Sequence, residues 1–225
     1  MSSGVLYVVA TPIGNLSDMS ARAVETLKSA DIVAAEDTRH SRILFNHYGI
    51  HPQRVVSYHA HNIESRTREL VEELRSGKNV ALVTDAGSPG ISDPGAVLVR
   101  EAVAQGVTIC PLPGASAVTL ALMASGLPTH KFVYEGFLPR KKGRKTMFES
   151  WVNEERSIVF FESPHRIVKT LREIQAITGS RQVCVAREMT KLHEEFIRGQ
   201  IGDVAGELEK RGEVKGEITA VIAPY

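Results

Sequence analysis

The sequence has few of the residues that define several protein classes. It has two cysteines in 225 residues, Cys110 and Cys184, which are too few for a disulfide framework or a cysteine-based zinc site. Both lie in apolar, strand-like stretches, so we expect buried free thiols of a cytoplasmic protein. The longest apolar run, residues 117–124, is interrupted by Thr119. It is less than half of the ~20 residues that a membrane-spanning helix needs.

The chain also lacks a targeting pattern and an excess of charge of one sign. Its first ten residues have no basic start and only a short apolar run, unlike a secretory signal. The 27 basic and 26 acidic side chains nearly cancel, so a nucleic-acid partner must be met by a local patch. The rest of the composition, 43% hydrophobic and 24% charged, excludes a disordered, collagen-like or coiled-coil chain.

Short apolar runs alternate with amphipathic segments through the first half of the chain. We expect strands at 6–10, 31–35, 55–58, 80–83 and 107–112, and helices at 21–30, 42–48, 64–75, 97–104 and 115–124. This alternation is typical of a mostly parallel sheet with helices on both faces.

The second half has a different rhythm. Its expected strands are 132–138, 157–161, 183–187, 195–198 and 217–222, and its expected helices are 146–153, 167–177 and 204–210. Two of these strands follow each other with no helix between them, so part of this sheet should be antiparallel. The change in rhythm predicts two α/β domains, residues 1–116 and 117–225.

Three loops rich in glycine and proline follow strands of the first half, at residues 11–15, 85–95 and 113–117. Ligands of open α/β sheets bind beyond the carboxyl ends of the strands, and small residues let a backbone approach a ligand closely. Any one of these loops is explained as a turn, but three at one edge favour a nucleoside site. The sequence has neither a dinucleotide fingerprint nor a P-loop.

A run of cations lies between an expected strand and an expected helix. Its members are Arg140, Lys141, Lys142, Arg144 and Lys145. A solvated turn is the common explanation of such a run. Because the next acid in the sequence is Glu149, we favour binding of RNA phosphates.

Several of these segments resemble those of the tetrapyrrole methylase superfamily of S-adenosylmethionine-dependent enzymes. The glycine loops carry the resemblance to the superfamily. The resemblance to its ribosomal RNA branch is carried by Glu-Asp-Thr-Arg-His at 36–40, Glu-Gly-Phe-Leu-Pro at 135–139 and Glu-Ser-Pro-His-Arg at 162–166. Arg-Glu-Met-Thr-Lys at 187–191 adds to it, and the resemblance covers essentially the whole chain.

The resemblance implies two α/β domains of tetrapyrrole methylase type, the first with a mostly parallel sheet and the second with a mixed sheet. It implies a ligand cleft between them, a homodimer, and no metal or membrane. The implied activity is 2'-O-methylation of a cytidine ribose in the decoding centre of small-subunit (16S) rRNA, as free rRNA or in the ribosomal subunit. The residues implied to contact the donor, S-adenosylmethionine, are Pro12, Ala86, Gly87, Ser88, Ile91, Ser116, Ala117, Glu162 and Met189.

Methyl transfer to a ribose hydroxyl requires alignment of the oxygen and removal of its proton. A base, or a cation beside the developing alkoxide, should therefore lie near the ligand edge of the sheet. The candidates there are Glu36, Arg39 and His40. Asp37 and Thr38 are equally well explained as a helix N-cap. No single residue stands out as the base.

Other candidates and functions stay open. His165 is as well explained by capping or a solvated surface position as by catalysis, and His59 and His61 fit a metal site poorly because no cysteine is near. A methyltransferase of the same fold acting on a small molecule, such as a corrin precursor, needs no basic loop. An RNA-binding module without catalysis would bind RNA but not the methyl donor.

Overall fold

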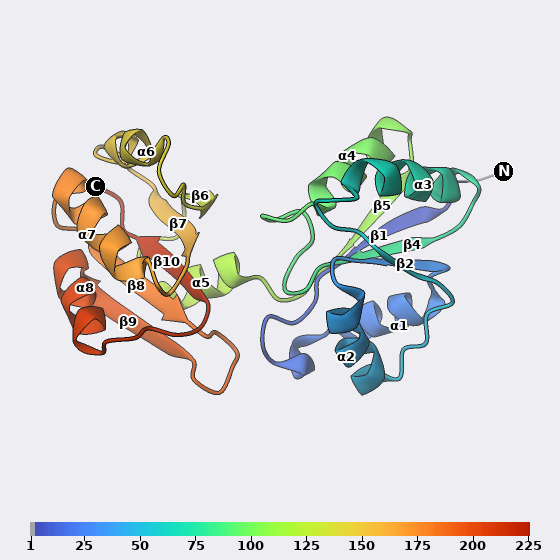
Figure 1. Ribbon diagram of the computed structural model, residues 1–225, viewed down its shortest axis with the longest axis horizontal. Helices are drawn as coiled ribbons and strands as arrows, with labels where there is room; N and C mark the ends of the chain where they lie inside the picture. The colour runs from blue at the N-terminus through green and yellow to red at the C-terminus, as the bar shows by residue number, and fades with distance from the viewer. Residues whose placement is uncertain (1–2) are drawn as a thin grey trace. The chain divides into compact units, whose positions relative to one another are not determined.

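The computed structural model describes residues 3–225. The chain divides into two compact units, Met1–Ser116 and Ala117–Tyr225. Each unit is built on its own five-stranded sheet with helices packed against it (Figure 1).

All strand pairs of the first sheet are parallel. Its strands are β1 (Val5–Val9), β2 (Ile32–Ala35), β3 (Val55–Ser57), β4 (Val80–Val83) and β5 (Thr108–Leu112), in the order β3-β2-β4-β1-β5. The predicted mostly parallel sheet is therefore confirmed. Because the strands are parallel, their carboxyl ends meet at one edge, where ligands of such sheets bind.

Helices cover both faces of this sheet. They are η1 (Leu16–Asp18), α1 (Ala21–Ser29), α2 (Thr38–Tyr48), α3 (Ile63–Arg75) and α4 (Gly95–Ala104). Figure 1 shows α3 and α4 on one side of the sheet and α1 and α2 on the other. Strand β4 shows why the sequence folds this way: Val80 and Leu82 join the core under α3 and α4, whereas Ala81 and Val83 join the core under α1 and α2. A strand buried on both faces has to be apolar throughout.

The second sheet is mixed, as predicted. Its strands are β6 (Phe132–Phe137), β7 (Ser157–Glu162), β8 (Gln182–Arg187), β9 (Glu195–Gln200) and β10 (Ile218–Ile222), in the order β6-β7-β10-β8-β9. Only the β6–β7 pair is parallel, and the other pairs are antiparallel.

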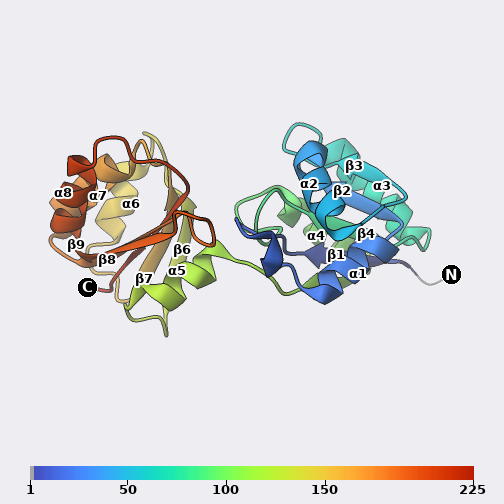
Figure 2. The same ribbon diagram turned by 90° about the horizontal axis from the view of Figure 1, so that it is seen from below.

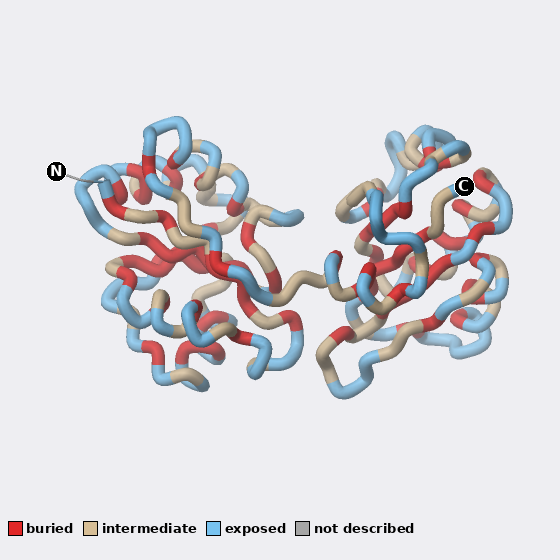
Figure 3. The backbone as a smooth tube through the Cα atoms, turned by 180° about the vertical axis from the view of Figure 1, so that it is seen from behind, coloured by how far each residue is buried: buried red, intermediate tan, exposed pale blue. Residues whose placement is uncertain are grey.

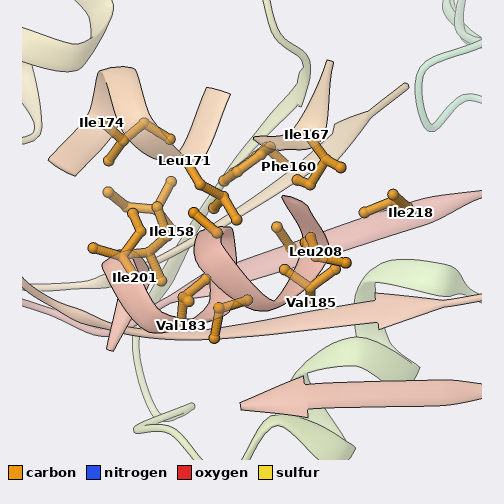
Figure 4. Close-up of a cluster of buried hydrophobic side chains, with 14 of the residues drawn as sticks. Ile158, Phe160, Ile167, Leu171, Ile174, Val183, Val185, Ile201, Leu208 and Ile218 are labelled. Carbon is orange, nitrogen blue, oxygen red and sulfur yellow. The ribbon is translucent and has the colours of Figure 1, made fainter. Parts of the chain in front are cut away.

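Helices also lie on both sides of the second sheet (Figure 2). They are α5 (Ala117–Ser125), α6 (Arg144–Ser150), α7 (Ile167–Thr178) and α8 (Ile201–Lys210). Figure 4 shows the core beneath α7 and α8, where Phe160, Leu171 and Leu208 are fully buried. On the opposite face α5 packs against β7, β8, β9 and β10.

Buried residues follow the strands and the inner helix faces, and exposed residues lie mainly in loops and on outer helix faces (Figure 3). Both cysteines are free thiols, and Cys184 is buried as expected, whereas Cys110 is only half-buried. Burial raises the pKa of the Cys184 thiol. Among residues 3–225 no helix is long and apolar enough to cross a membrane.

Several helices begin earlier than the sequence pattern predicts. The helix expected at 42–48 begins at Thr38, because the Asp37 carboxylate caps its first turn by accepting from the Arg39 N–H. Helix α6 begins at Arg144 rather than at 146, after Gly143 in a left-handed conformation with φ of 79°. These starts place Arg39 and Arg144 in first helical turns, where the apolar periodicity carries no signal.

Candidate functional site

The structure brings the three glycine and proline loops of the first unit together. The Thr11 N–H donates to the Gly87 carbonyl at 2.9 Å, and the Gly87 N–H donates to the Thr11 carbonyl at 3.1 Å. The Ser88 hydroxyl donates to the Ala115 carbonyl at 3.3 Å. The loops after β1, β4 and β5 are therefore tied into one cluster at the carboxyl edge of the sheet.

Two glycines of this cluster are required by their surroundings. Gly87 has a φ of 84°, and a Cβ there would lie 3.4 Å from the Ile13 Cγ2 atom. At Gly114 a Cβ would lie 2.7 Å from the Ala10 Cβ atom, which is too close for any other residue. Gly114 thus allows two loops to approach closely, and Gly87 allows a left-handed turn.

The loop cluster suits a nucleoside ligand. Ala86 is exposed, and neither its N–H nor that of Ala115 donates to any group of the residues that the structure describes. Pro12 is half-buried, and Ile91 has 48% of its surface exposed. Unpaired backbone donors beside small and apolar side chains fit a ligand held mainly by backbone contacts.

Carboxylates gather at the same edge, at the ends of β2 and β4. The Asp37 N–H donates to the Asp85 carboxylate at 3.0 Å, and the Asp85 N–H donates to the Glu36 carboxylate at 3.4 Å. The Asp93 carboxylate accepts from the N–H groups of Gly90 and Gly95, the latter at 2.7 Å. Asp93 therefore shapes its own loop, whereas Glu36 and Asp85 hold the two strand ends together.

Glu36 lies in an environment that raises the pKa of its carboxyl group. Burial raises its pKa above the ordinary value, and the neighbouring carboxylates of Asp85 and Asp93 raise it further. The hydrogen bond from the Asp85 N–H and the imidazole of His59 offset part of this shift. A half-buried carboxyl with a raised pKa, at the ligand edge of a sheet, is a candidate general base.

The other two catalytic candidates are exposed. The Arg39 side chain is 88% exposed, and its guanidinium binds both oxygens of Asp37, at 2.7 Å and 3.1 Å. The hydrogen bond from the Arg39 side chain lowers the pKa of Asp37. His40 is exposed in the first turn of α2. Asp37 is thus a helix cap, as the structural explanation predicted, and it also orients Arg39.

The sequence also offers His59, His61 and His165 as candidates. The ring centroids of His59 and His61 lie 5.9 Å apart, and His165 is exposed in the turn before α7. The buried Nδ1 atom of His59 has no hydrogen-bond partner among the described residues. Within residues 3–225, no group of three or more histidine, cysteine or acidic side chains is placed to hold a metal ion.

In the second unit, Glu162 is the centre of a buried polar network. Its fully buried carboxylate accepts from the Ser163 N–H at 2.7 Å and from the Thr170 hydroxyl at 2.8 Å. It also pairs with Arg166 and, at 3.7 Å, with Arg144. This carboxylate therefore has partners inside its own unit, and the donor contact that the resemblance implies for Glu162 stays a prediction.

The basic run is not uniform. Arg144 is 11% exposed, and its guanidinium donates to Glu173 and to the Thr170 hydroxyl, each at 2.6 Å. Lys145 lies 3.6 Å from Glu149. Two of the five cations therefore have acidic partners. The partner of Lys145 is Glu149, the next acid in the sequence, whereas Glu162 and Glu173 are distant from Arg144 in the sequence.

The remaining three cations differ from Arg144 and Lys145. Arg140, Lys141 and Lys142 are exposed and form no ion pair with any residue that the structure describes.

The remaining residues implied to contact the donor are Ser116, Ala117 and Met189. Ser116 and Ala117 are half-buried where α5 begins. Met189 is buried between Glu188 and Thr190, which have φ angles of 51° and 66°. The left-handed conformation is rare for such residues and makes this a strained loop. A donor contact by Met189 stays a prediction.

Comparisons with known proteins define the class. The family Tetrapyrrole (Corrin/Porphyrin) Methylases matches residues 5–205. The ribosomal RNA small subunit methyltransferase I of Thermotoga maritima is 47% identical over 220 residues, covering 98% of both chains. That of Bacillus subtilis is 48% identical over 220 residues, covering 97% of this chain and 75% of its own. The chain belongs to the tetrapyrrole methylase family. Within that family it is similar to the proteins named ribosomal RNA small subunit methyltransferase I, which confirms the resemblance drawn from the sequence.

Solved structures show the same fold. Diphthine synthase is 18% identical with a TM-score of 0.74, covering 98% of this chain and 90% of its own. Uroporphyrin-III C-methyl transferase from Thermus thermophilus, complexed with S-adenosyl homocysteine, is 20% identical with a TM-score of 0.66, covering 98% and 97%. At these identities the likeness concerns the fold alone.

Proposed function

We propose that this chain transfers a methyl group from S-adenosylmethionine to the 2'-hydroxyl of a cytidine ribose in small-subunit rRNA, in the decoding centre. The observation that carries the proposal is the 47% identity to a ribosomal RNA small subunit methyltransferase I over 98% of both chains. The loop cluster and the exposed cations support it. A homodimer in the cytoplasm belongs to the same proposal.

The methyl donor fits the loop cluster of the first unit. Gly87 permits a backbone turn that other residues resist, and the N–H groups of Ala86 and Ala115 are available to a ligand. We assign donor contacts to Pro12, Ala86, Gly87, Ser88, Ile91, Ser116 and Ala117. When bound, S-adenosylmethionine supplies a methyl group that is already activated for displacement, so the protein's own task is alignment and proton removal.

Glu36 is proposed to take the proton of the 2'-hydroxyl as the ribose oxygen accepts the methyl group. Its raised pKa lies closer to the working pH than the pKa of an ordinary glutamate does, which favours general base catalysis. The hydrogen bond from the Asp85 N–H fixes the carboxylate at the end of β2. Arg39 and His40, in the exposed first turn of α2, are proposed to hold the ribose or its phosphate.

RNA phosphates are proposed to bind at the loop before α6. Arg140, Lys141 and Lys142 are the exposed cations of this loop without acidic partners among the described residues. Lys145 is 82% exposed beside Glu149 and adds a weaker contact. Arg144 is held by acids of its own unit, so we no longer assign it a phosphate.

The test is methyl transfer from donor labelled in its methyl group. The purified chain is incubated with small ribosomal subunits, with free small-subunit rRNA and, separately, with uroporphyrinogen. We expect label in the RNA of at least one of the first two samples. Label only in the tetrapyrrole would assign the chain to small-molecule methylation. Binding of RNA without binding of donor would make it an RNA-binding module.

A further inference from the structure

The edge strand β6 ends in an exposed aromatic side chain beside the basic loop. Phe137, its last residue, has 64% of its surface exposed. The β6–β7 register shifts between Tyr134 and Phe137, and Gly136 within this shift has a φ of 65°. Such an irregularity redirects the side chains that follow it.

The Phe137 ring contacts another aromatic ring of the same sheet. It meets the ring of Phe161 on β7 at a centroid distance of 5.3 Å and an interplanar angle of 61°. Tyr134 meets the same Phe161 ring at 5.3 Å and 71°. These edge-on contacts restrain the ring while most of its surface stays open to solvent.

The backbone between Phe137 and the cations is held by contacts of Leu138 and Pro139 within the second unit. The Leu138 side chain is buried. The carbonyl of Leu138 accepts from Arg166 at 3.5 Å, and the carbonyl of Pro139 accepts from Arg144 at 3.0 Å. Both guanidinium groups pair with the buried carboxylate of Glu162. The network therefore fixes the backbone that presents the basic loop.

Phe137 and the free cations lie within reach of one short RNA segment. Three residues of extended chain span at most about 11 Å, so the Cα atoms of Phe137 and Arg140 lie no further apart than that. Arg140, Lys141 and Lys142 follow in sequence and are exposed. An aromatic ring flanked by uncompensated cations is the combination with which proteins bind single-stranded nucleic acid.

We propose that Phe137 stacks on a base of single-stranded RNA while Arg140, Lys141 and Lys142 bind the adjacent phosphates. The inference rests on the proposed function and names the part of the RNA that this surface holds, an unpaired and accessible base. Charge complementarity favours RNA over a second copy of this chain, because a symmetric contact through this surface would bring like charges together.

The test compares Phe137→Ala with Phe137→Trp. The probe is a labelled single-stranded oligocytidylate RNA, titrated over a range of salt concentrations. Loss of one stacked base should weaken binding about 5- to 150-fold, and tryptophan should restore it. The slope of log affinity against log salt should not change, because no phosphate contact is lost. Phe132→Ala is the matched control, since Phe132 lies at the other end of β6 and is 45% exposed.

Several outcomes would overturn the inference. One is Phe137→Ala binding RNA as the wild type does. Another is a change of sedimentation coefficient in Phe137→Ala but not in Phe132→Ala, which would place the ring in a protein interface. If the wild type methylates small subunits and Phe137→Ala binds RNA normally, only this inference fails. If the wild type neither binds the probe nor methylates subunits, the proposed function fails with it.

Discussion

At the scale of single residues, Glu36 is the residue on which the proposed proton transfer depends. Its raised pKa means that the folded protein holds the proton of this carboxyl more tightly than the unfolded chain does, whose value is 4.5. Below pH 4.5 the neutral carboxyl increases the free energy of unfolding. This contribution is lost as the pH rises through the pKa that Glu36 has in the folded protein. An ionised Glu36 is therefore a cost to stability that a role in catalysis would explain.

Replacing Glu36 by glutamine should separate activity from stability. We expect methyl transfer to fall about 10²- to 10⁴-fold, the range for loss of a general base. The Tm near neutral pH should stay the same or rise, because the variant buries no charge. In the wild type, kcat/KM should increase with pH through an acid limb above pH 4.5. A variant with full activity, or with an unchanged acid limb, would remove Glu36 from the mechanism.

Replacing Arg39 should affect turnover, whereas replacing its partner Asp37 should affect stability. Arg39→Ala should lower turnover with little change in Tm, because the side chain is 88% exposed and its recorded partner is Asp37. Asp37→Ala should lower the Tm, because the cap of α2 is lost. Thermal melts and single-turnover rates of the two variants provide the comparison. A large fall in Tm for Arg39→Ala at normal turnover would make this residue structural.

At the scale of loops and helices, Gly87 tests the donor site. Gly87→Val should abolish donor binding, because the side chain strains the left-handed turn and adds bulk beside Ile13. A Cβ on residue 87 would lie 3.4 Å from the Ile13 Cγ2 atom. Left-handed strain costs about 1–2 kcal/mol, so the fold should survive. Gly106→Val is the control, since Gly106 has a φ of 71° and open space around it. Isothermal titration with S-adenosylmethionine should show normal affinity for the control. Equal affinity of both variants would contradict the loop assignment.

The Glu162 network should control both the stability of the second unit and the order of its basic loop. Glu162→Ala leaves Arg144 and Arg166 without their shared buried partner, and breaking a buried pair typically costs about 3–5 kcal/mol. Glu173→Ala is the matched control, because the Glu173 side chain is 33% exposed and pairs with the same Arg144. Urea unfolding should show a loss several-fold larger for Glu162→Ala. Faster tryptic cleavage after Arg140 or Lys141 should accompany it, and equal losses in both variants would contradict the assigned network.

Some elements could be predicted from local pattern and others could not. Strand β4 is predictable at residues 80–83, because an uninterrupted apolar run followed by a loop rich in glycine and proline leaves few alternatives. The start of α2 was missed because it depends on the Asp37 cap rather than on apolar spacing. The partners of Arg144 were missed because Glu162 and Glu173 reach it only through the tertiary fold. Pairing between distant residues has no local signal.

At the scale of the whole molecule, the net charge gives no sign of the proposed RNA surface. The chain is nearly neutral, so the proposed affinity for RNA depends on a local group of cations, here Arg140, Lys141 and Lys142. Replacing Arg140, Lys141 and Lys142 with alanine should flatten the salt dependence by up to about two units on a log-log plot, at roughly 0.7 per contact. Lys145→Ala should change the salt dependence less, because the Lys145 ammonium already lies 3.6 Å from the Glu149 carboxylate. Equal slopes for the triple variant and the wild type would place the RNA surface elsewhere.

The central claim is that this fold methylates the ribose of a cytidine in small-subunit rRNA. The most direct measurement is nucleoside mass spectrometry of that RNA after incubation of unmodified small subunits or rRNA with the protein and S-adenosylmethionine. We expect one new 2'-O-methylcytidine, absent when Gly87→Val replaces the wild type and strongly reduced with Glu36→Gln. A methyl group found on a base, on another nucleoside or on ribosomal protein would contradict it.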